Sequence, residues 1–339
     1  MLGYCGNLAI GKDASNGQTV KTRIVLEEIK KNIHIDEIEY VDTVQLREKP
    51  AREMIRLIGI IRKSSAMVIL PAHSAIKVLA FLLYFCKKEH RTYYVVIGGW
   101  LPEMLKKNKW LFRRVSNYKG IYVETKSMLE KMVEMGFHNV YLLPNCKPLK
   151  PIIDKGLYKK YVFCTFSRVS KEKGIELAIE AVKKVKEKLY DFPIELDIYG
   201  KPDEDYKYRF ESICRSLPEF VHYRGVRNAN ESQDCLKDNY ALLFPTYYSG
   251  EGFPGTIIDA FSAGLPVLAS DWKYNAEIVQ DGMTGYIYKA NDLDALVVAI
   301  ERAIKNEEEI DTMRVKCIKE AKKYTPENAI HDLVIHLKQ

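Results

Sequence analysis

Short β-branched or aromatic runs alternate along this chain with segments of helical periodicity, and this alternation constrains the fold most strongly. Strands that alternate with helices in this way form βαβ units, which build parallel sheets. The clearest helix spans 174–189, where apolar residues fall on one face. The strand-like runs are residues 1–8, 38–44, 66–70, 93–97, 120–124 and 140–143, then 161–166, 194–199, 221–223, 241–244 and 266–269. The helix-like segments of the first half are residues 18–32, 51–63, 74–87, 101–108 and 126–136.

A proline-rich stretch divides this alternation into two halves. Residues 144–160 contain three prolines and show no apolar period, which is typical of a linker. A chain of 339 residues has the length of two domains. We therefore expect two doubly wound, Rossmann-like domains, residues 1–148 and 149–325, facing each other across a cleft, with the C-terminal helix 326–339 packing back on the first. Ligands would bind there at the carboxyl ends of the strands.

Charge is unevenly distributed between the halves. The chain has 52 basic and 45 acidic side chains, a net charge of +7. Residues 1–150 hold 25 basic against 14 acidic side chains, and residues 50–119 alone hold 14 against 3. Such asymmetry indicates an anionic partner for the first half, either a nucleic acid or a membrane surface. Because no nucleic-acid recognition motif accompanies the charge, we expect no nucleic-acid partner.

The cysteines and the apolar runs indicate a cytoplasmic protein. Seven cysteines form no CxxC pair, so reduced thiols are expected rather than a disulfide framework. The N-terminus has no charged region followed by an apolar one, so no secretory signal is expected. The most apolar stretch, residues 78–86, is too short to span a bilayer. At most, the protein would be peripheral at the inner face of the cell membrane.

Several motifs approach known sites without completing them. Gly6, Gly11 and Lys12 have the spacing of a triphosphate-binding loop, but Asp13 stands where Ser or Thr would bind Mg²⁺. No GxGxxG follows the first strand, which argues against a dinucleotide oxidoreductase. Asp203 and Asp205 match the DxD pattern of metal-dependent glycosyltransferases, yet acidic residues are expected in a first helical turn from the macrodipole alone. We therefore expect no metal site.

Two segments of the second half carry the most informative chemistry. In Ser167–Gly174, Arg168 and Lys173 are five residues apart across a strand-to-helix turn, where cations can converge on an anion near the helix N-terminus. A diphosphate bound without a metal needs such fixed positive charge. In Tyr247–Ser270, Glu251 and Asp259 flank a Gly-Phe-Pro-Gly turn that leads into a helix. Carboxylates accept hydrogen bonds from sugar hydroxyls, and free N–H groups of a first helical turn suit phosphate.

Together these segments resemble the family 4 retaining glycosyltransferases of the GT-B fold. SRVSKEKG is similar to the Arg-x4-Lys diphosphate-binding turn of that family, and GEGFPGTIIDAFSAGLPV is similar to its Glu-x7-Glu element. NAEIV and DGMTG follow in the same order. In the first half, residues 17–19 resemble the family's glycine loop after the first strand. The resemblance implies transfer of a hexose from a nucleotide-diphosphate sugar, UDP-sugar favoured, to a hydroxyl acceptor.

The resemblance also implies roles for single residues. Arg168 and Lys173 would neutralise the donor diphosphate, and Glu251 would bind the donor sugar. Asp259 would hold the ribose, although the family usually has Glu there, and Pro254 removes a backbone N–H that the family often uses. The implied donor-binding residues are Gly17, Gln18, Thr19, Arg224, Val226, Gly252, Phe253, Gly255, Thr256 and Asp259.

The acceptor side matches less tightly. Where many relatives carry a His-Asp pair, this chain has Gly98, Gly99 and Trp100, and His73 is the nearest histidine candidate. The resemblance implies a saccharide or lipid-linked saccharide acceptor in bacterial polysaccharide biosynthesis, with no cofactor and no metal. The basic region 50–119 beside the apolar segment would suit anionic lipid headgroups. Two alternatives remain: a nucleotide-sugar 2-epimerase of the same fold, and a non-catalytic partner subunit of a glycosyltransferase.

Overall fold

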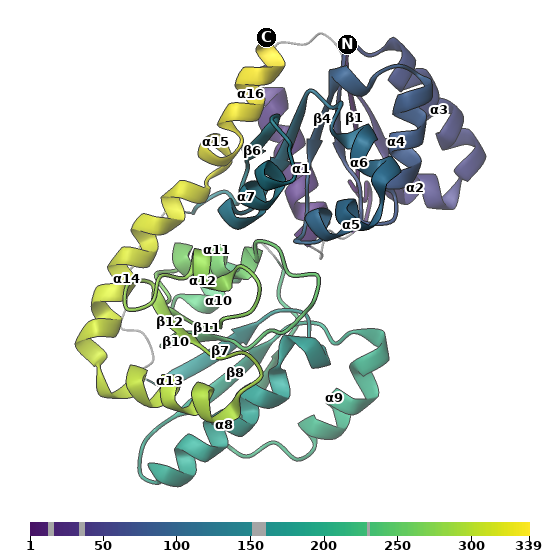
Figure 1. Ribbon diagram of the computed structural model, residues 1–339. Helices are drawn as coiled ribbons and strands as arrows, with labels where there is room; N and C mark the ends of the chain where they lie inside the picture. The colour runs from purple at the N-terminus through teal and green to yellow at the C-terminus, as the bar shows by residue number, and fades with distance from the viewer. Residues whose placement is uncertain (13–16, 34–37, 151–160, 229–230) are drawn as a thin grey trace. The chain divides into compact units, whose positions relative to one another are not determined.

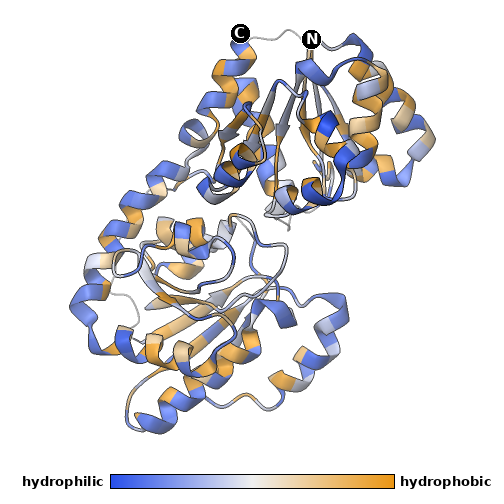
Figure 2. Cartoon of the chain, in the orientation of Figure 1, coloured by the Kyte–Doolittle hydropathy of each residue, from blue (hydrophilic) through white to orange (hydrophobic). Residues whose placement is uncertain are grey.

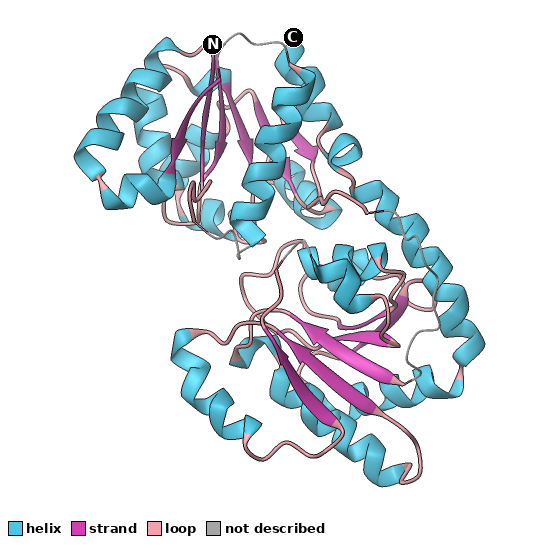
Figure 3. Ribbon diagram, turned by 180° about the vertical axis from the view of Figure 1, so that it is seen from behind, coloured by secondary structure: helices cyan, strands magenta, loops and turns pink. Residues whose placement is uncertain are grey.

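The computed structural model describes residues 1–12, 17–33, 38–150, 161–228 and 231–339, which divide into two compact units. The N-terminal unit comprises Met1–Lys147 together with Tyr324–Gln339, and the C-terminal unit comprises Pro148–Lys323. Each unit is built around one six-stranded sheet (Figure 1). Helices lie on either side of the strands in both units (Figure 3), which confirms the doubly wound α/β architecture expected from the sequence.

The sheet of the N-terminal unit is entirely parallel, with strand order β2-β1-β3-β4-β5-β6. The direction of strand addition reverses between β1 and β3, and ligands of such sheets bind outside the carboxyl ends of the strands at this switch point. The strands are β1 (Leu2–Gly6), β2 (Ile38–Asp42), β3 (Ala66–Leu70), β4 (Thr92–Val95), β5 (Gly120–Val123) and β6 (Val140–Leu142). The helices are α1 (Gly17–Asn32), α2 (Thr43–Glu48), α3 (Pro50–Lys63), α4 (Ile76–Phe85), η1 (Glu89–Arg91), α5 (Leu101–Lys107), α6 (Lys109–Val115) and α7 (Lys126–Glu134).

The sheet of the C-terminal unit is also entirely parallel, with strand order β12-β11-β10-β7-β8-β9. Its switch point lies between β7 and β10. The strands are β7 (Val162–Phe166), β8 (Glu195–Tyr199), β9 (Val221–Gly225), β10 (Ala241–Phe244), β11 (Val267–Ser270) and β12 (Gly285–Tyr288). The helices are η2 (Lys171–Lys173), α8 (Ile175–Lys188), η3 (Glu204–Tyr206), α9 (Lys207–Cys214), α10 (Ser232–Leu236), α11 (Gly255–Ser262), α12 (Asn275–Ile278), α13 (Leu293–Lys305), α14 (Glu307–Ala321) and η5 (Lys322–Tyr324).

The C-terminal end of the chain belongs to the core of the N-terminal unit. Helices α15 (Pro326–Ala329) and α16 (His331–Lys338) place Ile330 and Leu333 in the same buried cluster as strand residues of the first sheet. Tyr93 donates its hydroxyl hydrogen to the His336 carbonyl at 2.7 Å. The sequence prediction placed the domain boundaries at 148/149 and 325/326, and the structure divides the chain at 147/148 and 323/324.

Most predicted elements are confirmed within one to three residues, and some elements of the structure were not predicted. The strand expected over 38–44 ends at Asp42, because its carboxylate accepts the Val44 amide and caps α2. Helix α6 and strand β12 were not predicted. Asn108 ends α5 and caps α6 in the same way, so α6 begins directly after the predicted helix. Strand β12 has only four residues and follows a tight turn, so no alternation marks it.

All seven cysteines are free. Within the described ranges, no helix has both the length and the apolar character that crossing a bilayer requires.

Candidate active site

Two loops meet at the carboxyl edge of the C-terminal sheet. One follows β7 and holds Arg168 and Lys173, and the other follows β10 and holds Glu251. Strands β7 and β10 are parallel neighbours at the switch point, so their carboxyl ends open side by side. This juxtaposition joins the two segments that the sequence singled out.

Lys173 and Glu251 form a buried ion pair in this site. The Lys173 ammonium donates to Glu251 Oε2 at 2.6 Å, and only 11% and 9% of the two side chains are exposed. Thr246 donates its hydroxyl hydrogen to the same carboxylate oxygen at 2.9 Å. A charge-assisted hydrogen bond between two buried side chains is screened less by solvent than a surface ion pair, and it fixes both side chains.

Arg168 is held by a different carboxylate. Its Nη1 donates to both oxygens of Asp203, at 3.1 and 3.2 Å, and half of the arginine side chain is exposed. The guanidinium carbon lies 6.0 Å from the centroid of the Tyr248 ring, and the Lys173 ammonium lies 5.1 Å from the same centroid. The structure therefore brings both predicted cations to one aromatic ring. Each is already paired with a carboxylate, so a bound diphosphate must share these cations or displace their partners.

Three hydrogen bonds fix the loop that carries Glu251. The Tyr247 amide donates to the Glu172 carbonyl at 2.8 Å, and Ser270 donates its hydroxyl hydrogen to the Thr246 carbonyl at 2.6 Å. Trp272 Nε1 donates to the Tyr248 carbonyl at 2.7 Å. These bonds tie the loop to η2 and to the end of β11, so the site is preorganised.

Gly174 determines how closely the two loops approach. It lies between η2 and α8 with a φ of +71°, in the left-handed region that favours glycine. A Cβ atom at this position would lie 2.3 Å from the carbonyl oxygen of Pro245, the residue that precedes Thr246. Only glycine allows this contact, which places Lys173 beside the Glu251 loop.

The N-terminus of α11 forms another side of the site. Gly252 and Phe253 are buried just before α11 begins at Gly255. Thr256 donates its hydroxyl hydrogen to the Phe166 carbonyl at 2.9 Å, which ties the helix to the end of β7. Free N–H groups in this first turn can receive an anion.

Asp259, the predicted ribose ligand, lies within α11 and is only 5% exposed. Its Oδ1 accepts a hydrogen bond of 2.9 Å from the Ser232 hydroxyl of α10. Because Asp259 is buried and accepts a hydrogen bond from a hydroxyl, it is not a solvated surface aspartate.

Arg224 and Val226, two of the implied donor-binding residues, lie at and just beyond the carboxyl end of β9. Arg224 Nε donates to Asp197 Oδ1 at 2.7 Å, while 54% of Val226 is exposed. The Tyr199 hydroxyl donates to Asp197 Oδ2 at 3.3 Å. Burial and the neighbouring carboxylate raise the pKa of Tyr199, so this phenol stays protonated as a donor.

The predicted residues of the first half gather at the carboxyl edge of the N-terminal sheet. Residues 17–19 open α1, where the Thr19 hydroxyl donates to Asn7 Oδ1 at 3.0 Å. His73 is exposed after β3, and its ring meets Trp100 edge-on with centroids 4.8 Å apart. Gly99 is buried beside them. The structure thus brings His73 and Trp100 together.

Several residues at these two edges were not predicted. Thr246, Tyr248 and Asp203 surround the predicted cations. Asp203 was noted only for its DxD spacing, and its contact with Arg168 was not predicted because the two residues are remote in sequence. No motif indicated Thr246 or Tyr248. In the N-terminal unit, Lys21 pairs with Glu124 at 2.7 Å, both fully buried. Lys21 lies four and eight residues before the buried Val25 and Ile29, so the three share one face of the helix. A lysine on an apolar helix face was therefore the sequence feature that could have indicated a buried ion pair.

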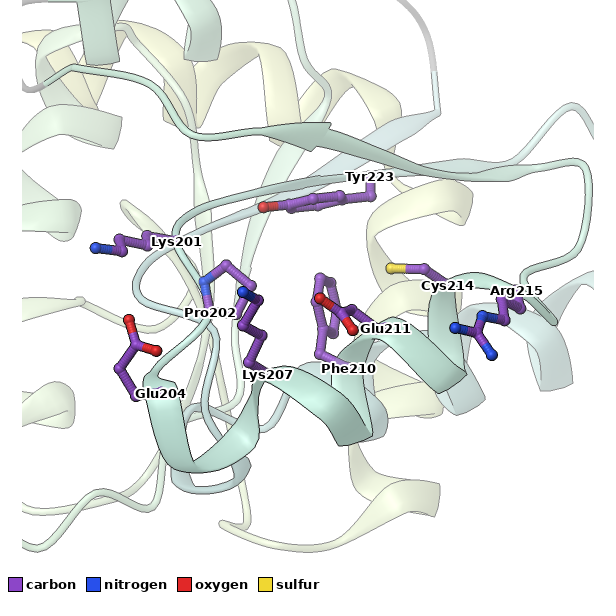
Figure 4. A pocket seen from close by; sticks show the side chains of 9 residues that line it. All are labelled: Lys201, Pro202, Glu204, Lys207, Phe210, Glu211, Cys214, Arg215 and Tyr223. Atoms are coloured by element: carbon purple, nitrogen blue, oxygen red, sulfur yellow. The ribbon is translucent and has the colours of Figure 1, made fainter.

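A separate open pocket of about 500 Å³ lies between α9 and the edge strand β9 (Figure 4). Phe210 and Tyr223 meet edge-to-face in it, with centroids 5.0 Å apart. Its cationic and acidic side chains are mixed, and none of its nine lining residues is a predicted site residue. We therefore do not assign the donor site to this pocket.

The described part of the chain holds no group of three or more His, Cys, Asp or Glu residues arranged to bind a metal ion. Asp203, the first residue of the DxD match, is the partner of Arg168.

Two doubly wound parallel sheets in one chain, with paired cations and a buried carboxylate at the edge of the second, define a GT-B-type protein. Residues 153–324 match the family described as "Glycosyl transferases group 1", and the chain belongs to that family.

The chain is similar to several bacterial glycosyltransferases. It is 25% identical over 236 residues to the poly(glycerol-phosphate) alpha-glucosyltransferase of Bacillus subtilis (strain 168), covering 68% of this chain and 34% of the relative. It is 30% identical over 144 residues to the GtfA subunit of a UDP-N-acetylglucosamine–peptide N-acetylglucosaminyltransferase of Streptococcus gordonii, covering 42% of this chain and 27% of the relative. The chain thus spans about a third of the length of these curated relatives.

Solved structures share the fold at low sequence identity. Anabaena Alr3699/HepE in complex with UDP superposes with a TM-score of 0.77 at 14% identity, covering 99% of both chains. The pneumococcal O-GlcNAc transferase GtfA, in complex with UDP and GlcNAc, gives a TM-score of 0.66 at 16% identity, covering 84% of this chain and 59% of the other. These likenesses confirm the fold class.

Proposed function

We propose that this protein transfers a hexose from a nucleotide-diphosphate sugar, with UDP-sugar favoured, to a hydroxyl acceptor with retention at the anomeric carbon. The observation that carries the proposal is the buried Lys173–Glu251 pair with Arg168 beside it, at the carboxyl edge of the second sheet. Family membership and relatives named as glucosyl- and N-acetylglucosaminyltransferases support this activity, as do neighbours solved with UDP.

In this proposal, the cations receive the donor diphosphate. Lys173 and Arg168 neutralise it and stabilise the charge that develops on it in the transition state. Glu251 accepts hydrogen bonds from the donor sugar, while Asp259 takes the ribose. The remaining donor contacts are Gly17, Gln18, Thr19, Arg224, Val226, Gly252, Phe253, Gly255 and Thr256.

The transfer step exchanges one bond at the anomeric carbon. The bond from this carbon to the diphosphate oxygen breaks while the acceptor hydroxyl oxygen forms a bond on the same face. The hydroxyl proton passes to the departing diphosphate, so the products are a nucleoside diphosphate and a glycoside. The protein contributes positioning and stabilisation of charge.

The acceptor side of the proposal uses the N-terminal unit. We assign His73, Gly99 and Trp100 to the acceptor, which we propose to be a saccharide or lipid-linked saccharide of bacterial polysaccharide biosynthesis. The His73–Trp100 pair offers an aromatic face and a polar edge, which suits a sugar ring.

The test begins with a thermal-shift screen against nucleotide sugars. A donor present at about a thousandfold its Kd stabilises the folded state by about 4 kcal/mol. Incubation of the stabilising donor with saccharide acceptors, with and without EDTA, should give a glycoside of retained configuration at the same rate. An epimerised donor formed without acceptor would favour the 2-epimerase, and no turnover despite tight donor binding would favour the partner subunit.

An exposed apolar surface of the N-terminal unit favours an anionic membrane as a further partner. Helix α4, mostly orange in Figure 2, exposes Val78, Phe81 and Phe85, the last by 65%, and α6 beside it exposes Trp110. An apolar patch rimmed by polar residues marks an interaction site. Four exposed side chains on these helices or directly after them are cationic: Lys77, Lys87, Lys109 and Arg113. We propose that aromatic side chains enter the lipid interface while these cations bind anionic headgroups.

Replacing Phe81 and Phe85 together with serine should weaken binding to phosphatidylglycerol vesicles more than tenfold, because burying each phenyl ring contributes about 1.5–3 kcal/mol. Vesicle co-sedimentation at moderate salt measures this effect. Ile55→Ser is the matched control, since Ile55 is an exposed apolar residue on α3, and it should leave binding unchanged. Failure of the unaltered protein to bind anionic vesicles would remove the membrane proposal.

A further inference from the structure

A buried ion pair lies at the carboxyl edge of the N-terminal sheet, and neither of its residues is among the proposed donor contacts. Lys21, in the second turn of α1, donates to Glu124 Oε1 at 2.7 Å, and only 1% and 2% of the two side chains are exposed. Removing two charges from water is costly, and apolar residues of similar size would often be at least as stable.

The second oxygen of Glu124 holds the loop that follows β4. The Gly98 amide donates to Glu124 Oε2 at 2.9 Å. Lys21 also reaches the same loop, since its ammonium donates to the Val96 carbonyl at 3.4 Å. One carboxylate therefore connects α1, the end of β5 and the backbone of the β4–α5 loop.

This loop carries the residues assigned to the acceptor. Gly98 has a φ of +90°, in the left-handed region that favours glycine, so the loop turns at this residue. Trp100 Nε1 donates to the Ile97 carbonyl at 2.8 Å, and the Trp100 ring meets His73 edge-on. The position of the Gly98 amide thus determines where Gly99 and Trp100 lie.

We infer that Glu124, oriented by Lys21, is a positioning residue that sets the conformation of the acceptor-binding loop Ile97–Trp100. The inference rests on the proposed function, because it assigns this loop to the acceptor. Glu124 acts through the Gly98 amide, and its effect falls on acceptor binding while donor binding stays the same.

The number of hydrogen-bond acceptors at position 124 gives a sharp test. In Glu124→Gln, one amide oxygen must serve both Lys21 and Gly98, so we expect the KM for the acceptor to rise about tenfold. In Lys21→Met/Glu124→Gln, the competing ammonium is gone and the oxygen can return to Gly98, so the acceptor KM should recover. In Lys21→Met/Glu124→Leu, which is equally uncharged, no oxygen remains and the KM should rise again.

The readouts separate positioning from stability. Across the series, we expect the donor KM to stay within about twofold, and amide hydrogen exchange at residues 97–100 to follow the acceptor KM. If Lys21→Met/Glu124→Leu does not fold, the comparison of Glu124→Gln with Lys21→Met/Glu124→Gln still decides the outcome. Glu53→Gln, which alters another buried carboxylate on α3, is the control and should leave both KM values unchanged.

Equal acceptor KM values across the series, or values that follow thermal stability alone, would overturn the inference. A rise in the donor KM of similar size would also overturn it. The proposed function fails differently, because the unaltered protein would then transfer no sugar from any nucleotide donor.

Discussion

Replacing Lys173 with alanine is expected to reduce sugar transfer by about 10²–10³-fold while the chain remains folded. The substitution removes the buried cation that we assign to the donor diphosphate. In the proposed mechanism, charge that develops on the leaving phosphate then loses a buried cation, and Arg168, which is half exposed, compensates little. Steady-state transfer rates at saturating donor measure the loss.

Folding should survive because Glu251 keeps one hydrogen bond, from Thr246 at 2.9 Å. Circular dichroism and the thermal midpoint check this expectation. Lys171→Ala, which removes an exposed cation from the same short helix, is the matched control and should retain turnover. Turnover near the unaltered level in Lys173→Ala would overturn the assignment of the diphosphate site.

Gly174→Ala is expected to lower the free energy of unfolding of the C-terminal unit by about 2–5 kcal/mol. Holding alanine at a φ of +71° costs about 1–2 kcal/mol. The new methyl group would lie 2.3 Å from the Pro245 carbonyl oxygen, and relieving such overpacking costs about 1–3 kcal/mol more. Relief requires η2 to move away from the loop after β10, which separates Lys173 from Glu251.

Gly225→Ala is a matched control for this substitution. Gly225 has a φ of +79°, but a Cβ there meets no atom within 4 Å. The Gly225→Ala variant should therefore lose only the part of the free energy of unfolding that comes from the strained backbone, about 1–2 kcal/mol. Urea titration of both variants measures the difference, and equal losses would show that the contact with Pro245 carries no energetic weight.

Much of the fold follows from local sequence patterns. Buried runs such as Ala66–Leu70 and Ala241–Phe244 are strands at the predicted residues, because a strand buried on both faces reads as a continuous apolar run. A predicted strand boundary was displaced where a single side chain determines it. The Asp42 carboxylate caps α2, and this ends the strand two residues earlier than predicted.

The candidate site was predictable to a smaller extent. Arg168, Lys173 and Glu251 came from motifs, because these residues are close in sequence to the glycines and helix starts that identify them. Asp203 and Thr246 were not predicted as members of the site. The contact of Asp203 with Arg168 depends on β7 and β8 being neighbours, and local sequence patterns do not determine strand order. Thr246 is only five residues from Glu251, and no motif indicated that its hydroxyl would donate to that carboxylate.

The sequence by itself determined that the chain forms parallel α/β sheets, carries cations at a strand-to-helix turn, and concentrates basic charge in residues 50–119. Only the tertiary structure decided which carboxylate meets which cation. Lys173 pairs with Glu251, 78 residues away, and Lys21 pairs with Glu124, 103 residues away. In each sheet, the strand order brings the carboxyl ends of strands that are remote in sequence to the same edge of that sheet. Both pairs are also buried, and burial is a property of the packed sheets rather than of any single segment.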